Sequence, residues 1–267
     1  MRPEPTPRPK GSRTGGYRHR ELPDEVPVPF DIPVIYRDDD IVVVDKPHFL
    51  ATMPRGCHVT QSAVVRLRRE LGLPELSPAH RLDRLTAGVL LFTVRRELRG
   101  AYQMLFARRR VHKTYLARAA ADPAIELPCL VRSRIVKRRG WLQAVEEPGE
   151  PNAETLVELV APDGLYRLTP RTGRTHQLRV HMASLGLPIQ GDPLYPNVID
   201  VAPDDFTMPL QLLAHTLEFA DPLTGEPRRF VSRRSLQPHE TPARPGAGPS
   251  AGDGRTVAVS NARPPGA

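Results

Sequence analysis

Short strand-like segments follow one another through the middle of the chain, and they constrain its fold more than any other feature. β-branched and apolar residues dominate the runs at 131–137, 141–145, 154–160 and 165–169, and only turns separate these runs. The chain shows no regular alternation of strands with helices, which would indicate a parallel sheet. The pattern therefore predicts an α+β fold with a largely antiparallel sheet.

The remaining elements are expected on both sides of this series. Apolar residues recur at helical spacing most clearly in 97–108, and similar signals predict helices at 62–71 and 175–185. Further strands are expected at 33–37, 41–45, 89–94, 111–117, 212–219 and 229–231. No internal repeat is visible in the sequence.

Proline and glycine separate the folded part of the chain from its two ends. Many of the 31 prolines and 19 glycines lie in the first thirty residues or after Gln237. Segments of this composition are too polar and too Pro-rich to bury a core. We expect a basic, Pro-rich flexible arm at 1–30, a folded domain at 31–237 and a disordered Pro/Gly/Ala-rich tail at 238–267.

Positive charge is concentrated in three arginine-rich stretches. The chain carries 38 Lys and Arg against 30 Asp and Glu, so its formal net charge is +8. The stretches 95–118, 131–140 and 165–181 contain Glu97 as their only acidic residue. A planar guanidinium suits bidentate phosphate binding and stacking on bases. These clusters indicate an anionic partner, most simply a nucleic acid.

Several other classes of protein are disfavoured by the sequence. No apolar run approaches the ~20 residues of a membrane span, and no apolar stretch follows the basic N-terminus as it would in a secretory signal. Cys57 and Cys129 lie too far apart to supply a structural zinc site. We expect a cytoplasmic monomer with no metal and no membrane association.

Asp83 lies in the first segment that could carry chemistry, HRLDRLTAG at 80–88. Arginines at 81 and 84 favour the ionised form of its carboxyl group. A loop that precedes an apolar strand can present such a group to a cleft. A salt-bridged loop aspartate is the alternative, and the residues of this segment alone favour that alternative.

A second candidate segment is RTGRTHQLRVH at 171–181. Gly173 allows a tight turn, and Thr175 can cap the helix that follows. Free N–H groups at a helix N-terminus beside arginines suit a phosphate or carboxylate, although an ordinary capped helix explains the pattern too. His176 and His181 are five residues apart and fall on different helix faces, which disfavours a shared zinc ion.

Two further residues gain meaning only in combination with these segments. Lys46 ends a β-branched strand, and Pro47 prevents that strand from continuing. Tyr115 lies in a half-buried strand, where a tyrosine either belongs to the core or offers its ring to a stacked base.

The segments together, and in this order, resemble the RluA-type family of pseudouridine synthases. The matching motifs span about 32–230 and are DKPHFLATMPRG (45–56), HRLDRLTAGVLLF (80–92), KTYLA (113–117), RTGRTHQLRVHMASLGLPIQGDPLY (171–195) and LLAHTLEF (212–219). HRLD and GRTHQLR are highly specific when they occur together. The resemblance implies the α+β pseudouridine synthase catalytic fold over 31–237: a mixed, mostly antiparallel sheet flanked by helices, with a central basic cleft.

The resemblance also implies the roles of particular residues. Asp83 matches the essential catalytic aspartate, and Tyr115 matches a tyrosine that stacks on the target base and could remove the proton at C5. Arg174 matches the arginine that pairs with the aspartate, and Arg81 matches a residue that replaces the flipped nucleotide. Residues expected to contact RNA are Lys46, His80, Arg84, Thr86, Lys113, Arg171, Thr175, Gln177 and Arg179.

The expected function is isomerisation of uridine to pseudouridine in structured ribosomal or transfer RNA. The reaction needs base flipping and an ionised Asp83, and it needs no cofactor. We expect Asp83, Tyr115 and Arg174 to line one cleft, with Arg174 within salt-bridge range of Asp83.

Two other functions are weighed against this one. A catalytically inactive RNA-binding module is the main alternative, although binding alone requires no carboxylate in a basic cleft. A metal-dependent nuclease would have to group Asp83, His80 and His176, whose spacing is unsuitable. The sequence departs from the family where Ala87 replaces the usual serine, and 1–30 is too short for an S4-like RNA-binding module.

Overall fold

One mixed sheet organises the part of the chain that the computed structural model describes, residues 25–56 and 58–237. The helices are α1 (Ala63–Leu71), α2 (Arg99–Ala107), α3 (Gln177–Ser184) and the short 3₁₀ helix η1 (Arg96–Leu98). The strands are β1 (Val34–Arg37), β2 (Ile41–Lys46), β3 (Ser77–Pro78), β4 (Ala87–Thr93), β5 (Val111–Arg118), β6 (Cys129–Val136), β7 (Val145–Glu147), β8 (Ala153–Ala161), β9 (Leu165–Pro170), β10 (Leu212–Ala220) and β11 (Pro227–Val231). The expected tail at 238–267 and most of the expected arm at 1–30 lie outside the described residues.

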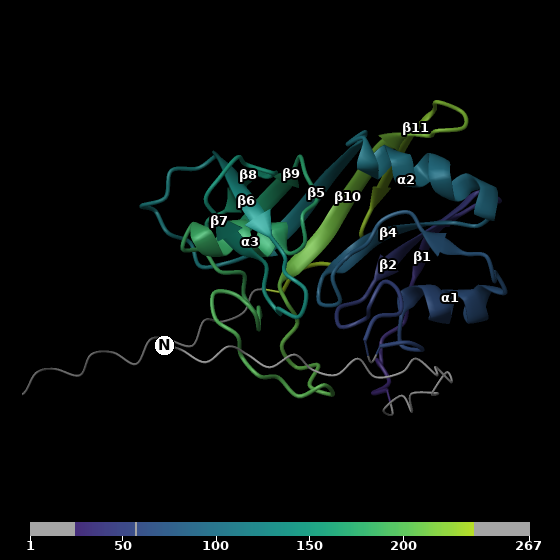
Figure 1. Ribbon diagram of the computed structural model, residues 1–267, viewed down its shortest axis with the longest axis horizontal. Coiled ribbons are helices and arrows are strands. Elements are labelled where there is room, and N and C mark those ends of the chain that lie inside the picture. Colours follow the sequence, from purple (N-terminus) through teal and green to yellow (C-terminus); the bar gives the residue numbers. More distant parts are fainter. Residues whose placement is uncertain (1–24, 57, 238–267) are drawn as a thin grey trace, which may run out of the picture.

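The strand order confirms the predicted class of fold. The sheet runs β1-β2-β4-β10-β5-β9-β8-β6-β7, with β11 added to β10 and β3 added to β4. Neighbouring strands are antiparallel except β4 and β10, which are parallel where Ala87 meets Leu213 and Gly88 meets Ala214. Figure 1 shows this sheet crossing the whole molecule, with helices on both of its faces.

The structure differs from the prediction at 141–145, of which only Val145 lies in a strand. Residues 137–144 form a loop between β6 and β7, and β7 begins only at Val145. The physical reason is Lys137, whose ammonium group donates to the carbonyl oxygens of Trp141, Leu142 and Gln143. All three carbonyl oxygens point toward one ammonium group. Successive carbonyls of an extended strand point in alternating directions and could not do so.

The core lies on both faces of the sheet because its central strands are buried on both sides. Every residue of β2 and β4 is buried. Val42 and Val44 pack on one face with α1 and α3, while Ile41 and Val43 pack on the other face with α2. This alternation follows the two-residue period of a strand.

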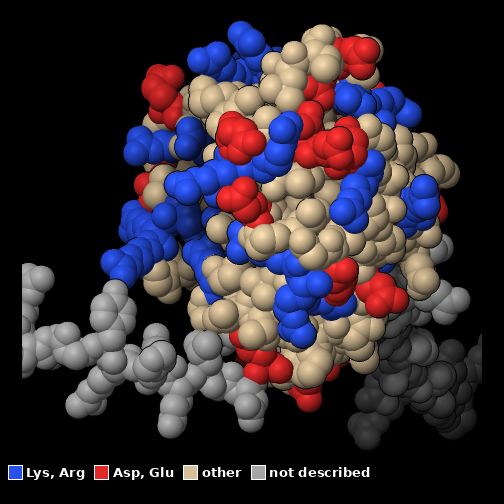
Figure 2. Space-filling view, turned by 90° about the vertical axis from the view of Figure 1, so that its right-hand side faces the viewer, with Lys and Arg blue, Asp and Glu red and all other residues tan. Residues whose placement is uncertain are grey.

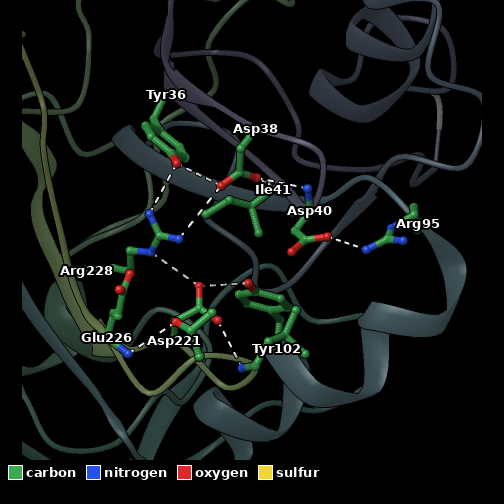
Figure 3. A network of polar contacts seen from close by, with 11 residues as sticks. Tyr36, Asp38, Asp40, Ile41, Arg95, Tyr102, Asp221, Glu226 and Arg228 are labelled. Atoms are coloured by element: carbon green, nitrogen blue, oxygen red, sulfur yellow. Dashed lines mark hydrogen bonds and ion pairs between the residues drawn. The ribbon is translucent and has the colours of Figure 1, made fainter.

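A polar network fastens the turn after β1 to the turn after β10 (Figure 3). The Asp38 carboxylate accepts from the Tyr36 hydroxyl at 2.8 Å, and that hydroxyl in turn accepts from Arg228 at 3.1 Å. Arg228 also reaches Asp221 at 3.3 Å, and the Tyr102 hydroxyl of α2 donates to the same carboxylate at 3.1 Å. The network holds α2, β1 and β11 together at one end of the sheet.

Candidate active site

Asp83 sits on the loop between β3 and β4, and three side chains fix the backbone of this loop. The Thr52 hydroxyl donates to the Leu82 carbonyl at 2.8 Å and accepts from the Leu82 N–H at 3.1 Å. The His48 ring lies 2.8 Å from the Leu85 carbonyl. The loop is therefore held immediately before Asp83 and two residues after it.

Lys46 is the third of these side chains, and it is enclosed by the protein. It is 0% exposed and donates to the carbonyls of Pro47 (2.9 Å), Leu50 (2.7 Å) and Arg84 (3.3 Å). Burial lowers its pKa to about 7, while the charge of Asp83 acts in the opposite direction. The expected contact of Lys46 with RNA is therefore wrong, because its ammonium group is enclosed by backbone carbonyls.

Asp83 lies in the lining of two cavities. The first has a volume of about 540 Å³ and the second about 700 Å³. Both are lined by Arg81, Leu82, Asp83, Thr175, His176 and Arg179. Asp83 is the only carboxylate that lines either cavity among the described residues, although several cations line each one. The predicted basic cleft is thus present, with one acid in it.

Most of the residues singled out in the sequence line these cavities. The first cavity includes His80, Arg81, Asp83, Thr86, Lys113, Tyr115, Arg171, Arg174, Thr175, Gln177 and Arg179. Arg84 lines the second cavity. Asp83, Tyr115 and Arg174 therefore share one cleft, although they come from a loop, β5 and the segment after β9.

Tyr115 enters the cleft from the middle of the sheet. It pairs with Leu168 of β9 on one side and Ala214 of β10 on the other. Burial, and after it the negative charge of Asp83, raise the pKa of the Tyr115 hydroxyl. The phenol therefore stays protonated at neutral pH, so it can take a proton from substrate only if it loses its own.

The expected ion pair between Arg174 and Asp83 is not present. Arg174 is exposed, and its Nε donates to the Asn152 carbonyl at 3.2 Å. Arg179 is the arginine whose pKa responds to Asp83. Burial opposes the change, but the hydrogen bond and charge of Asp192, followed by the charge of Asp83, raise the Arg179 pKa. Its Nε lies 2.7 Å from Asp192.

The start of α3 explains why Arg174 is exposed while Arg179 is buried. The helix begins at Gln177, later than expected, and His176 before it has a left-handed backbone with φ 59°. Thr175 does not cap the helix. The segment before this turn, with Arg174, faces outward, while Arg179 lies on the helix and points into the protein, where it is 2% exposed.

Gln177 also has a different role from the one expected. It is buried, and its amide oxygen accepts from the Thr172 hydroxyl (2.7 Å) and the Arg174 N–H (3.0 Å). Its amide nitrogen donates to the Glu154 carbonyl and the Thr155 hydroxyl, both at 2.9 Å. Because these bonds use the whole amide, Gln177 holds the turn at 172–177 together and has no polar atom left for RNA.

Cations of the first cavity are held in different ways. The Lys113 ammonium group donates to the Thr172 carbonyl at 3.4 Å, and burial followed by the charge of Arg109 lowers its pKa. Arg171 is exposed and pairs with Glu154 at 2.7 Å. On the side of the molecule shown in Figure 2, acidic and basic side chains are mixed, and basic ones gather toward the left edge. A basic lining with exposed arginines suits a phosphate backbone.

The comparisons with known proteins show the family of this chain. A family model described as RNA pseudouridylate synthase matches residues 40–184, which is more than half of the chain. The chain belongs to this family. No helix within 25–56 or 58–237 has the length and apolar character to cross a membrane.

Members of the family from distant organisms are similar to this chain. "Pseudouridylate synthase RPUSD2" of Homo sapiens is 35% identical over 184 residues, which are 67% of this chain and 33% of that protein. The chain thus spans about a third of the length of this relative. "Dual-specificity RNA pseudouridine synthase RluA" of Escherichia coli (strain K12) is 33% identical, over 74% of this chain and 90% of that protein.

A solved structure of the family has the same fold. "Human RNA Pseudouridylate Synthase Domain Containing 1" superposes with a TM-score of 0.60 at 25% identity, covering 76% of this chain and 84% of that one. The pseudouridine synthase fold expected from the sequence is therefore confirmed.

Proposed function

We propose that this protein isomerises uridine in RNA to pseudouridine and that Asp83 is the residue on which the reaction depends. The observation that carries the proposal is the placement of Asp83, the only acid that the described residues contribute to the lining of two basic cavities. A cleft that serves only to bind RNA gains nothing from a negative charge at its centre, because that charge repels phosphates.

The proposed reaction leaves the composition of the RNA unchanged. The bond from N1 of uracil to C1′ breaks, the base turns, and C5 bonds to C1′; the C5 proton leaves and N1 gains a proton. The target must first leave its stack. Arg81 is exposed and lines both cavities, so it is placed to fill the vacated position. Tyr115 would stack on the extruded base.

Arg179 takes over the orienting role first expected of Arg174. It is fixed by Asp192 and lines both cavities beside Asp83. A buried cation held in this way would orient the Asp83 carboxylate toward the extruded base. Arg174 and Arg171 remain exposed at the rim, where contact with phosphates is the simpler role.

Structured RNA is the proposed substrate. One relative, of Saccharomyces cerevisiae, is named "tRNA pseudouridine(32) synthase, mitochondrial", and the E. coli relative is named as dual-specificity. We therefore propose a uridine in transfer or ribosomal RNA. A catalytically inactive RNA-binding protein stays the alternative.

Tritium release from RNA that carries C5-labelled uridine tests the proposal. The wild-type protein should release tritium, and Asp83→Asn should release it at least 100-fold more slowly. The variant should bind the same RNA as tightly as the wild type or more tightly, since it removes a negative charge from a basic cleft. RNA binding by the wild type without any release would favour the inactive binding protein.

A further inference from the structure

His176 carries the clearest unassigned feature of the cleft. Its left-handed backbone is uncommon for a residue with a side chain, and such strain concentrates at functional positions. It lines both cavities beside Asp83. The sequence indicates no role for His176 except that of a metal ligand, which its spacing from the other candidate ligands disfavours.

A hydrogen-bond network fixes which nitrogen of the His176 ring carries the proton. The Tyr195 hydroxyl accepts from the Ala144 N–H at 2.7 Å and donates its one proton to the Ala144 carbonyl at 3.0 Å. His176 Nδ1 lies 2.9 Å from the same hydroxyl. Because the hydroxyl has no second proton, Nδ1 must be the donor.

The opposite tautomer would leave a buried carbonyl without a partner. If the hydroxyl donated to His176 instead, the Ala144 carbonyl would lose its only hydrogen bond within the described residues, and Ala144 is 1% exposed. Such a loss is unfavourable in a buried position. Burial also lowers the pKa of His176 to about 4, so the doubly protonated ring is scarce at neutral pH.

His176 Nε2 is therefore a neutral hydrogen-bond acceptor, and it has no partner among the described residues. The cations of the two cavities are donors, among them Arg81, Lys113 and Arg179. Uracil presents two carbonyl oxygens with one N–H between them, at N3. The cations complement the oxygens, but N3–H needs an acceptor other than the catalytic carboxylate.

We infer that His176 Nε2 accepts a hydrogen bond from N3–H of the extruded uracil and so selects uridine over cytidine. Cytosine carries a lone pair at N3, which would face the Nε2 lone pair. His176 would thus be a specificity-determining residue, positioned by Tyr195. The inference rests on the proposed function, and it names the part of the base that the protein recognises.

The test compares uridine with 3-methyluridine, which lacks the N3 proton, at one target position of a synthetic RNA. Isomerised nucleosides are separated by chromatography after digestion. The wild type should prefer uridine by roughly tenfold or more. His176→Phe, which keeps a ring but loses the acceptor, should reduce this preference to about threefold or less, mainly by slowing uridine.

Tyr195→Phe provides a second variant that leaves the imidazole in place. Without the hydroxyl, nothing holds the proton on Nδ1, so the preference for uridine should fall here too. 4-Thiouridine is the matched substrate control, because it keeps the N3 proton. Its rate relative to uridine should not change in either variant.

The outcomes separate the inference from the proposed function. If the wild type converts uridine but both folded variants keep its full preference over 3-methyluridine, the role of His176 is wrong and the activity stands. If the wild type isomerises no uridine in any RNA, the proposed function itself fails. Folding of each variant is checked by thermal unfolding.

Discussion

Thr52 lines the second cavity, and it shows how a buried side chain can govern the reaction through the loop that it holds. Its hydroxyl makes both hydrogen bonds to Leu82, directly before Asp83. Thr52→Val keeps the shape of the side chain and leaves a buried N–H and a buried carbonyl unpaired. We expect unfolding to become easier by about 1–3 kcal/mol. Turnover should fall roughly tenfold, since the carboxylate loses its exact placement.

Thr93→Val is the matched control for this variant. Thr93 is also buried in the protein, and its hydroxyl makes one bond, to Ser77 at 3.3 Å, away from the cleft. Urea unfolding and tritium release measure the two effects separately. Equal turnover of the two valine variants would show that Thr52 does not position Asp83.

The sequence predicts the residues of the site better than their contacts. Asp83 and Tyr115 were found from short motifs, and the structure places both in one cavity. The expected pairing of Arg174 with Asp83 is absent because the left-handed turn at His176 delays the start of α3 and leaves Arg174 exposed before the helix. Thr52 gives no signal, because its partner is 30 residues away in the chain.

Gly88 controls how closely β4 and β10 approach each other. It follows the Asp83 loop, has φ +113°, and a Cβ atom there would lie 2.2 Å from the Ala214 carbonyl oxygen. Gly88→Ala should therefore separate β4 from β10 and lower stability by about 2–4 kcal/mol. Turnover should fall as well, because Tyr115 pairs with the same residue of β10.

Gly100→Ala is the control at this scale. Gly100 lies in α2 with open space around it, so alanine should stabilise the protein by up to about 1 kcal/mol and leave turnover unchanged. Calorimetry gives the two unfolding temperatures. Stability of Gly88→Ala at the wild-type level would contradict the close approach of the strands.

Elements were predicted well where periodicity alone decides them. Strands β8 and β9 lie within a residue or two of their expected positions, as do α1 and α2. The segment 141–145 resembles a strand because it is short, mostly apolar and flanked by turns, yet three of its carbonyls bind Lys137. A single long-side-chain contact of this kind leaves no trace in the hydrophobic pattern.

The stability of the whole molecule depends on pH through histidines that the fold keeps neutral. Burial lowers the pKa of His48 and of His176 to about 4, and burial followed by the charge of Lys113 lowers that of His80 to about 3. The hydrogen bond of His80 also requires a neutral ring, because its Nε2 accepts from the Leu91 N–H at 3.2 Å. His80 and His176 line the cleft, and His48 contacts the loop that carries Asp83.

Stability should therefore decrease as pH falls from about 6.5 toward 4. Below pH 6.5 the unfolded chain protonates these histidines, while the folded chain does so only near pH 3–4, so the unfolded state binds more protons throughout this window. His80→Gln keeps an acceptor for Leu91 but cannot titrate. The free energy of unfolding is measured by urea titrations at several pH values. Its slope against pH should be smaller in this variant than in the wild type by up to about 1.4 kcal/mol per pH unit. An unchanged slope in His80→Gln would mean that His80 is not held neutral by the fold.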